Sequence, residues 1–385
     1  MTRIVVQRPA GAARRLTLLH LLLAAAVASA LGCGHRVRVV PDFRIRSCGA
    51  IVDPAGAQLD RSLVSWMSPD DVGDRARLDA WCGTVGPAVV TEPRSASPIL
   101  ADRLVVVGWN VHLGAGDVVR LVDDLRAGRI GEGAADGPIV LLLQETFRSG
   151  EQVPASVAGT PAPHRLAPDG APRRSALEIA AQLHLNVYYL PTMRNGRGDA
   201  PVEREDRGLA IMSSLPLSNL QAIELPFERQ RRPAAVATVR LVTSYGHELN
   251  LRVVNVHLEN RSGARRLWMA SPHARNRQAG ALTVSLGGDV PTLLEGDLNT
   301  WANREPALEH LGREFTPCTD GRSTFGGGLR LDWVFARLPG GWTVTCRRAD
   351  QKYGSDHYPI VAVVRNATRK PGPTPVLSSP CDKCP

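Results

Sequence analysis

Aromatic residues are scarce in this chain, since Phe, Trp and Tyr make up only 5% of its 385 residues. Few flat side chains are therefore present on which nucleic-acid bases could stack. The longest apolar run, residues 16–30, is too short for a comfortable transmembrane helix, and no internal repeat is visible. No cluster of His and Cys has the spacing of a zinc site. These absences disfavour a membrane-spanning helix, a repeat fold and a zinc centre.

The charge is only mildly basic. The formal net charge is +9, and four of the arginines lie in the first 15 residues, where no acid stands. A dedicated nucleic-acid binder often carries a stronger basic stripe. The content of 43% hydrophobic and 22% charged residues is ordinary for a globular protein with a sizeable core. The charge thus permits an anionic substrate without selecting one.

Residues 1–32 have the pattern of a secretory signal peptide, in which a basic start precedes an apolar run and small residues. The alternative is a buried N-terminal helix. Residues 30–33 resemble the lipobox of bacterial lipoproteins, although Ala30 stands where Leu is usual. We therefore expect an exported protein, either a cell-envelope lipoprotein anchored to the membrane through Cys33 or a secreted one.

The cysteines also favour export to an oxidising compartment. The seven cysteines are Cys33, Cys48, Cys82, Cys318, Cys346, Cys381 and Cys384. Without Cys33 an even number remains, and disulfides persist in oxidising compartments. Nearness in sequence suggests the pairs Cys48–Cys82 and Cys318–Cys346, out of many possible pairings. A disulfide in the tail is the simpler interpretation of Cys381 and Cys384, the alternative being a redox or zinc half-site.

The chain divides into four predicted parts. After the signal peptide, residues 33–100 form an N-terminal extension and linker, with a short helical region between residues 62 and 82 and prolines before the first strong strand. Residues 101–365 form the main domain, and residues 366–385 a Pro-rich flexible tail.

Short strands interleaved with a few helices predict a layered α/β sandwich for the main domain. Strands are expected at residues 104–108, 139–143, 209–212, 236–241, 251–257, 291–295, 331–335, 342–346 and 360–364. Asp117 caps one expected helix, Ser175 opens a second with a capping box, and residues 276–286 form a third.

Acids, amides and histidines stand at the ends of five of these strands. The segments are Trp109-Asn110-Val111-His112, Gln144-Glu145, Asn255-Val256-His257-Leu258, Gly296-Asp297-Leu298-Asn299, and Asp332 with Ser355-Asp356-His357-Tyr358-Pro359. Polar groups on very apolar strands are costly unless they converge on partners or a metal. One such group is usually a turn or a cap, but five together predict a site.

This ordered series resembles the motifs of the endonuclease/exonuclease/phosphatase superfamily, which includes deoxyribonucleases, apurinic endonucleases, neutral sphingomyelinases and inositol polyphosphate phosphatases. The resemblance covers residues 101–365. It implies a four-layer α-β-β-α sandwich with two packed mixed β-sheets. We expect a monomer.

The resemblance also implies metal chemistry. Glu145 would be the main Mg²⁺ ligand, with Asn110 and Asp356 nearby. A hard cation prefers oxygen ligands and neutralises the phosphate anion, which favours Mg²⁺, or alternatively Mn²⁺, over Zn²⁺.

The remaining motif residues would handle protons and the phosphoryl group. His357 is the candidate base for an attacking water, and the family pattern implies that Asp332 fixes its ring. Asp297 would orient the water or protonate the leaving oxygen. Asp297 and Asn299 stand two apart in an expected extended segment, so both should face one side.

Three residues are candidate phosphate ligands. Asn299 would donate to a phosphoryl oxygen. His257 would bind the phosphate or act as an acid, the alternative being a strand-end His bonded to backbone. Arg207 either binds phosphate or is a solvated loop charge.

Four substrate hypotheses remain, with a slight lean to a nuclease, for which the Arg clusters at 229–232 and 261–266 could supply a basic groove. A lipid phosphodiesterase or phosphatase acting on phospholipid headgroups would suit the basic and apolar stretch 265–269, which could equally be a buried anchor. The others are a phosphatase for soluble esters and an inactive surface binding protein, against which the intact motif residues argue.

Overall fold

The computed structural model describes residues 38–41, 48–92, 99–130, 137–155, 159–161, 170, 172–196, 204–260 and 272–367. The signal pattern with Cys33, the stretch 261–269 and the cysteines of the tail lie outside these residues, so the expectations about them stay predictions. The chain divides into two compact units, Met1–Arg36 and Val37–Pro385, and only the second contains described residues. None of the helices described there is both long and apolar enough to cross a bilayer.

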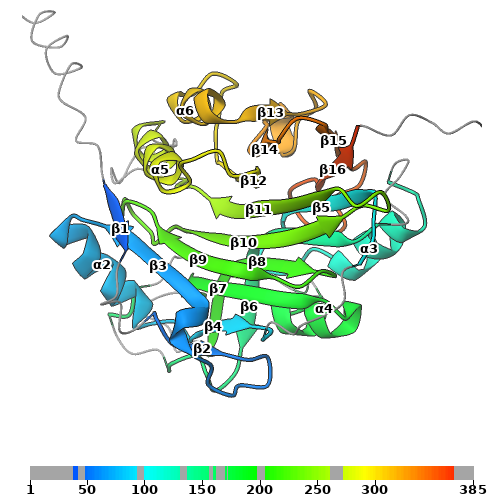
Figure 1. The fold of residues 1–385 in the computed structure, drawn as a ribbon. Helices are drawn as coiled ribbons and strands as arrows, with labels where there is room; N and C mark the ends of the chain where they lie inside the picture. The colour runs from blue at the N-terminus through cyan, green and yellow to red at the C-terminus, as the bar shows by residue number, and fades with distance from the viewer. Residues whose placement is uncertain are drawn as a thin grey trace, which may run out of the picture. The chain divides into compact units, whose positions relative to one another are not determined.

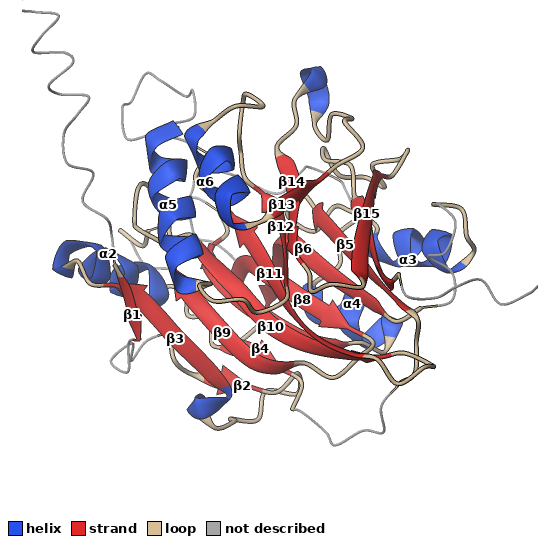
Figure 2. Ribbon diagram, turned by 45° about the horizontal axis from the view of Figure 1, so that its top comes forward, coloured by secondary structure: helices blue, strands red, loops and turns tan. Residues whose placement is uncertain are grey.

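Two mixed sheets of eight strands each form the centre of the fold (Figures 1 and 2). The first sheet has the order β1 (Val39–Pro41), β3 (Val64–Pro69), β9 (Ser218–Glu224), β10 (Pro233–Val242), β11 (Glu248–His257), β12 (Thr292–Asp297), β14 (Asp332–Arg337), β13 (Thr316–Cys318). The second has the order β15 (Trp342–Arg348), β16 (Ile360–Asn366), β5 (Arg103–Asn110), β6 (Ile139–Ser149), β8 (Glu205–Ser213), β7 (Asn186–Arg194), β4 (Ala88–Val90), β2 (Ile51–Val52).

Helices cover the outer face of each sheet. They are α3 (Val118–Arg126) and α4 (Ala176–Leu183) on the second sheet, and α5 (Pro272–Ser285) and α6 (Pro306–Glu314) on the first. Helix α2 (Val72–Cys82) contacts β3 of the first sheet and β7 of the second, and there are short 3-10 turns at η1 (Arg61–Leu63) and η2 (Gly326–Gly328). One apolar cluster joins the two sheets, a second joins the second sheet to α3 and α4, and a third joins the first sheet to α5 and α6. The predicted four-layer α-β-β-α sandwich is therefore confirmed.

Strand pairing brings the polar motifs together. β5 runs parallel to β6 with Asn110 opposite Gln144, and β11 runs parallel to β12 with His257 opposite Asp297. Asp297 in turn lies opposite Asp332 of the antiparallel strand β14. Because the ends of neighbouring strands meet at one edge of a sheet, these side chains collect in one place.

One polar motif lies inside a strand, and the expectation that it follows the strand is wrong. Gln144 and Glu145 are in the middle of β6, where the register with β8 shifts between Leu143 and Thr146. Glu145 has a positive φ of 54° there. Bulges of this kind turn a side chain away from the regular alternation and are common next to active sites.

The strands ahead of residue 101 extend both sheets. β3 pairs with β9 and β1 pairs with β3, while β4 pairs with β7 and β2 with β4. The expected helical region at 62–82 is half right, since α2 forms but Val64–Pro69 is a strand. Both suggested disulfides are present, with Cα–Cα distances of 5.1 Å for Cys48–Cys82 and 5.6 Å for Cys318–Cys346.

Candidate active site

A pocket of about 180 Å³ opens where the polar strand ends meet. Seven residues singled out in the sequence line it, namely Asn110, Glu145, His257, Asp297, Asn299, Asp356 and His357. An eighth, Asp332, is hydrogen-bonded to His357. The ninth, Arg207, lines a smaller adjoining hollow that shares Glu145 and His257 with the first pocket. The structure thus brings all nine together.

His357 and Asp332 form a buried pair. The Nδ1 atom of His357 lies 2.8 Å from Asp332 Oδ2, and the exposed fractions of the two residues are 4% and 1%. A carboxylate accepting from Nδ1–H leaves Nε2 for the reacting side of the ring. Nε2 faces Asp297, with 3.8 Å to Asp297 Oδ2. The ring of Phe325 packs against the imidazole at 4.8 Å between centroids.

Hydrogen bonds to the segment Trp109–Asn110 hold the backbone of His357 in place. The hydroxyl of Ser355 donates to the carbonyl of Asn110 (2.6 Å) and accepts from the amide of His357 (3.0 Å). The indole N–H of Trp109 donates to the carbonyl of His357 (3.1 Å). These three bonds fix where the imidazole stands relative to Asn110, so two motifs almost 250 residues apart act as one unit.

Asp297 contacts several of the other polar residues of the pocket. It accepts from the side-chain amide of Asn110 (3.0 Å) and from the backbone amide of Asn299 (2.9 Å), and its Oδ2 lies 3.4 Å from His257 Nε2. Burial raises the pKa of Asp297 to about 7, against the opposing charge of His357. Near neutral pH this carboxyl can therefore take up and release a proton.

The electrostatics of His357 follow from its two acidic neighbours. Burial alone would lower its pKa, but the charges of Asp332 and Asp297 outweigh burial and raise the pKa to about 10. His357 and Asp297 therefore titrate as an interacting pair rather than as separate groups.

Asn299 departs from the extended geometry that the sequence suggested. Its φ is 53°, and its side-chain amide donates to the carbonyl of Leu258 (3.0 Å). His112 and Leu113 also have positive φ, of 48° and 57°. Residues other than glycine rarely adopt this conformation, and such strain gathers at functional sites. With Glu145, four such residues lie in the pocket lining or within three residues of Asn110 in the sequence.

The predicted metal ligands offer only oxygen atoms. Glu145, Asn110 and Asp356 line the same pocket, and Asn110 Oδ1 already accepts the backbone amide of His112 at 3.0 Å. Together with Asp297 they concentrate carboxylates in a small volume, which favours a bound cation. Oxygen donors of this kind suit Mg²⁺ or Mn²⁺, so the residues present fit the expected metal.

Asp297, Asp332 and His357 form an alternative candidate site for a cation. Atoms of Asp297, Asp332 and His357 lie within 4.8 Å of one another, a spacing that a metal could bridge. Asp332 Oδ2 is already committed to His357 Nδ1, however, and all three residues are deeply buried. This hydrogen bond leaves the group with fewer free oxygen atoms for a cation than Glu145, Asn110 and Asp356 would offer together.

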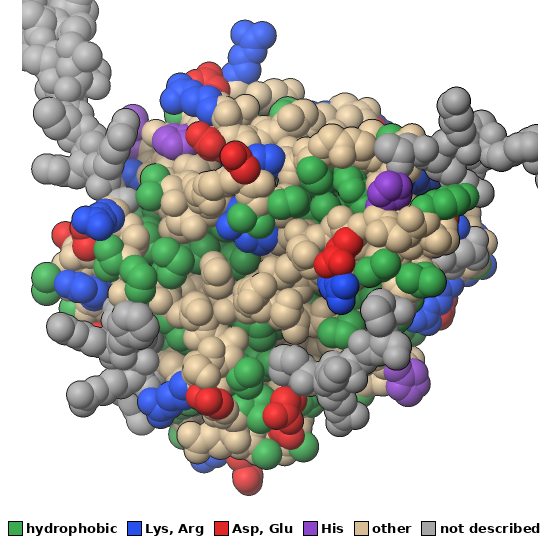
Figure 3. Space-filling view, in the orientation of Figure 1, with side chains coloured by type: hydrophobic (Ala, Val, Ile, Leu, Met, Phe, Trp, Pro, Cys, Tyr) green, Lys and Arg blue, Asp and Glu red, His purple; other side chains and the backbone are tan. Residues whose placement is uncertain are grey.

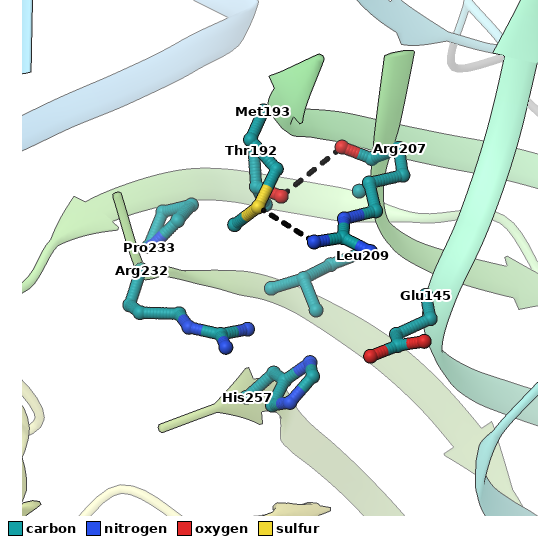
Figure 4. A pocket seen from close by; sticks show the side chains of 9 residues that line it. Glu145, Thr192, Met193, Arg207, Leu209, Arg232, Pro233 and His257 are labelled. Carbon is teal, nitrogen blue, oxygen red and sulfur yellow. Dashed lines mark hydrogen bonds between the residues drawn. The ribbon is translucent and has the colours of Figure 1, made fainter. Parts of the chain in front are cut away.

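The smaller hollow has a different character. It lies between β7, β8 and β10 and is lined by Thr192, Met193, Arg207 and Arg232 together with Glu145 and His257 (Figure 4). The Nη2 atom of Arg207 points at the sulfur of Met193 at 3.2 Å, and Thr192 Oγ1 donates to the carbonyl of Arg207. Its two guanidinium groups make this side of the site positive.

Several lining residues escaped the sequence argument because they come from loops. They are Asn260, Trp301, Phe325, Leu329 and Leu331 of the main pocket. Arg232 of the smaller hollow belongs to the Arg cluster at 229–232, which the sequence offered only as part of a basic groove. The one usable signal in the sequence was the Trp two residues after Asn299, and the structure shows Trp301 to be 42% exposed. The others are brought in by tertiary structure alone.

Comparison with known proteins agrees with this geometry. The family model described as "Endonuclease/Exonuclease/phosphatase family" matches residues 107–357, well over half of the chain. A comparison with curated proteins found no match.

Three of the solved structures to which the chain is similar are the following. An endonuclease/exonuclease/phosphatase from Beutenbergia cavernae has 19% identity and a TM-score of 0.48, covering 69% of this chain and 72% of that one. The human Nocturnin catalytic domain with bound sulfate has 17% identity and a TM-score of 0.45, with 69% and 95% covered. Sphingomyelinase C from Streptomyces griseocarneus has 18% identity and a TM-score of 0.40, with 68% and 99% covered. By its family match, the chain belongs to the endonuclease/exonuclease/phosphatase family of phosphoesterases.

Proposed function

We propose that this protein is an exported, Mg²⁺-dependent hydrolase, or alternatively Mn²⁺-dependent, that cleaves phosphodiester bonds of nucleic acid by attack of water. The observation that carries the reaction class is the single pocket in which Asp297, Asn299 and the Asp332–His357 pair face the oxygen donors around Glu145. The two disulfides support an oxidising compartment and hence export.

Each residue has a proposed task. A divalent cation held by Glu145, with Asn110 and Asp356 beside it, would neutralise the charge of the phosphoryl group. The charge of a cation bound beside the ring would lower the pKa of His357, so that Nε2, held in place through Asp332, could lose its own proton and then accept one from water. Asp297, between His257 and Asn110, orients that water or returns a proton to the leaving oxygen. Asn299 and His257 donate to the phosphoryl oxygens as charge develops.

Two observations favour a nucleic acid as the substrate. Trp301 stands half exposed in the lining of the pocket, where a base can stack on it. The positive hollow with Arg207 and Arg232 adjoins the pocket on the side of Glu145 and His257. On the face shown in Figure 3, the basic side chains are scattered among acidic and apolar ones and form no broad basic surface.

The same Trp301 supports the second candidate, a phosphodiesterase or phosphatase of phospholipid headgroups, because an exposed Trp at a pocket rim also suits a membrane interface. Lipid substrates would reach this rim from a bilayer. The two candidates share the chemistry at Glu145, Asp297 and His357 and differ only in what the rim contacts.

The test is hydrolysis by the purified mature protein with Mg²⁺, Mn²⁺ or EDTA. Substrates are single-stranded and plasmid DNA, RNA, sphingomyelin and inositol phospholipids in vesicles, and bis(4-nitrophenyl) phosphate. The variants are Glu145→Gln, His357→Ala and, as a control, the exposed Glu309→Gln. We expect metal-dependent cleavage of nucleic acid that only the first two variants lose. Preferential cleavage of a lipid would overturn the nuclease proposal, and no turnover of any ester would overturn the enzyme proposal.

A further inference from the structure

Two adjacent arginines of one loop have opposite environments. Arg231 is fully buried and saturated, since it pairs with Glu224 and donates to the carbonyls of Pro191 and Thr192. Arg232 is also buried, with 5% exposed, but its described neighbours include no carboxylate within ion-pair distance. Arg231 is thus a structural ion pair, whereas Arg232 is a buried cation that needs a counter-charge.

The hydrogen bonds of Arg232 are also incomplete. Nη2 donates to Gln230 Oε1 at 3.0 Å, whereas Nε is buried without a hydrogen-bond partner among the described residues. Figure 4 shows its guanidinium pointing into the space that Arg207, Glu145 and His257 also face. Glu145 is the one carboxylate among the residues lining this hollow, and it also lines the main pocket. A second anion is therefore expected between the two arginines.

The size and place of the hollow limit what that anion can be. Its volume is about 10 Å³, the room of a single water-sized atom, so a ligand can insert one oxygen but not a whole phosphate. The hollow shares Glu145 and His257 with the main pocket, so the inserted oxygen belongs to a group directly beside the reacting phosphate.

We propose that Arg232, together with Arg207, binds the backbone phosphate next to the one being cleaved in a nucleic acid strand. This inference rests on the proposed function. It adds that the substrate carries a second phosphate next to the bond that is cleaved. The enzyme would then favour substrates with two neighbouring phosphates over isolated phosphodiesters.

The test uses nitrophenyl esters that differ by one phosphate. Thymidine 5′-(4-nitrophenyl phosphate) is compared with its 3′-phosphorylated form, and the isomers with the ester at the 3′ position are measured as well. In the wild type the second phosphate should raise kcat/KM about 10-fold or more in at least one isomer, the value expected for a charge-assisted hydrogen bond. Arg232→Gln should remove that gain and change kcat/KM of the one-phosphate ester less than about 3-fold.

Arg240→Gln is the matched control, because Arg240 lies on the adjoining strand β10, is exposed and pairs with Glu248. Arg232→Lys keeps the charge but loses the Nε donor, and should retain part of the gain. It replaces Arg232→Gln if circular dichroism shows that the Gln variant does not fold. An equal loss on both esters, or no loss on either, would overturn the proposal.

A binding measurement separates this proposal from the proposed function. Calorimetry with thymidine 3′,5′-bisphosphate and thymidine 5′-monophosphate needs no turnover. Tighter binding of the bisphosphate by the wild type but not by Arg232→Gln supports the subsite even if no ester is hydrolysed. Equal affinities in the wild type would overturn it. If inositol 1,4-bisphosphate shows the Arg232-dependent gain and the nucleotide does not, the assignment to nucleic acid is overturned.

Discussion

Among single residues, Asp332 has a task that its neighbours cannot take over. It is the hydrogen-bond partner of His357 Nδ1, and replacing it with Asn offers that nitrogen an amide of uncertain direction. We predict that Asp332→Asn lowers kcat by about 10³-fold, as expected when a catalytic imidazole loses its orienting carboxylate, with little change in KM. The exposed Asp350→Asn serves as control. A higher KM with an unchanged kcat would contradict this role.

Glu295 is a second buried acid with a measurable signature. It lies between the sheets, where Gln144 Nε2 donates to its Oε2 at 3.1 Å. Burial, reinforced by the charge of Asp332, raises its pKa well above 4.5. The folded protein therefore keeps the proton while the unfolded chain releases it, so stability falls as pH rises above 4.5 until the folded pKa is reached.

We therefore predict that Glu295→Gln becomes progressively more stable than the wild type between about pH 5 and about pH 8, with a slope of up to about 1.4 kcal/mol per pH unit. Urea unfolding of both proteins at several pH values measures the difference. Parallel pH profiles of the two proteins would show that Glu295 is ionised in the fold.

Gly108 makes room for that acid. A Cβ atom at Gly108 would stand 1.6 Å from Glu295 Cδ, between two packed sheets. Gly108→Ala should cost about 2 kcal/mol or more in the free energy of unfolding, the range of overpacked cores. The double variant with Glu295→Ala should recover part of the loss, and a double-mutant cycle of unfolding free energies measures the coupling. Additive losses would mean that the clash is relieved elsewhere.

At the level of elements, α4 begins with a complete capping box. Ser175 Oγ accepts from the backbone of Glu178, and the carboxylate of Glu178 accepts from the backbone of Ser175. That backbone bond lowers the pKa of Glu178, so its contribution is present above pH 4.5 and is lost as pH falls. Ser175→Ala should cost about 1 kcal/mol in urea unfolding at neutral pH. Ser62→Ala, outside any α-helix, should cost less.

Elements with a strong local signal could be predicted from the sequence. Residues 139–143 are apolar without interruption because both faces of β6 are buried, and α4 carries its own capping box. Strands β7 and β9 and helix α6 were missed, and residues 64–69 were assigned to a helical region. β3 is a strand because it pairs with β9, some 150 residues away, and local propensity carries no trace of that partner.

Some features of the candidate site could likewise be predicted from the sequence, and others could not. Residues that sit at strand ends within recognisable motifs, such as Asp297 and His357, could be named from the sequence. The bulge at Glu145, the left-handed Asn299 and the contrast between Arg231 and Arg232 depend on registers and partners that only the folded chain supplies.

On the scale of the whole molecule, each disulfide joins two segments about 30 residues apart in the sequence. Cys48–Cys82 joins the segment before β2 to the end of α2, and closes a loop of 34 residues. Replacing both cysteines by Ala should lower the free energy of unfolding by about 3 kcal/mol. Limited proteolysis should then cut first between residues 48 and 92. Unchanged cleavage relative to the Cys318→Ala/Cys346→Ala variant would show that packing, not the bond, holds this segment.

The strand order also determines when, during translation, each strand can find its partner. β3 leaves the ribosome about 150 residues before its partner β9, so the first edge of the sandwich stays open until more than half the chain exists. Asp332 and His357 are made later still, and the hydrogen bond from Ser355 to the carbonyl of Asn110 joins segments 245 residues apart. A growing polypeptide therefore carries Glu145, the proposed metal ligand, about 200 residues before His357, the proposed proton acceptor, so the proposed hydrolysis could begin only after residue 357 has been made.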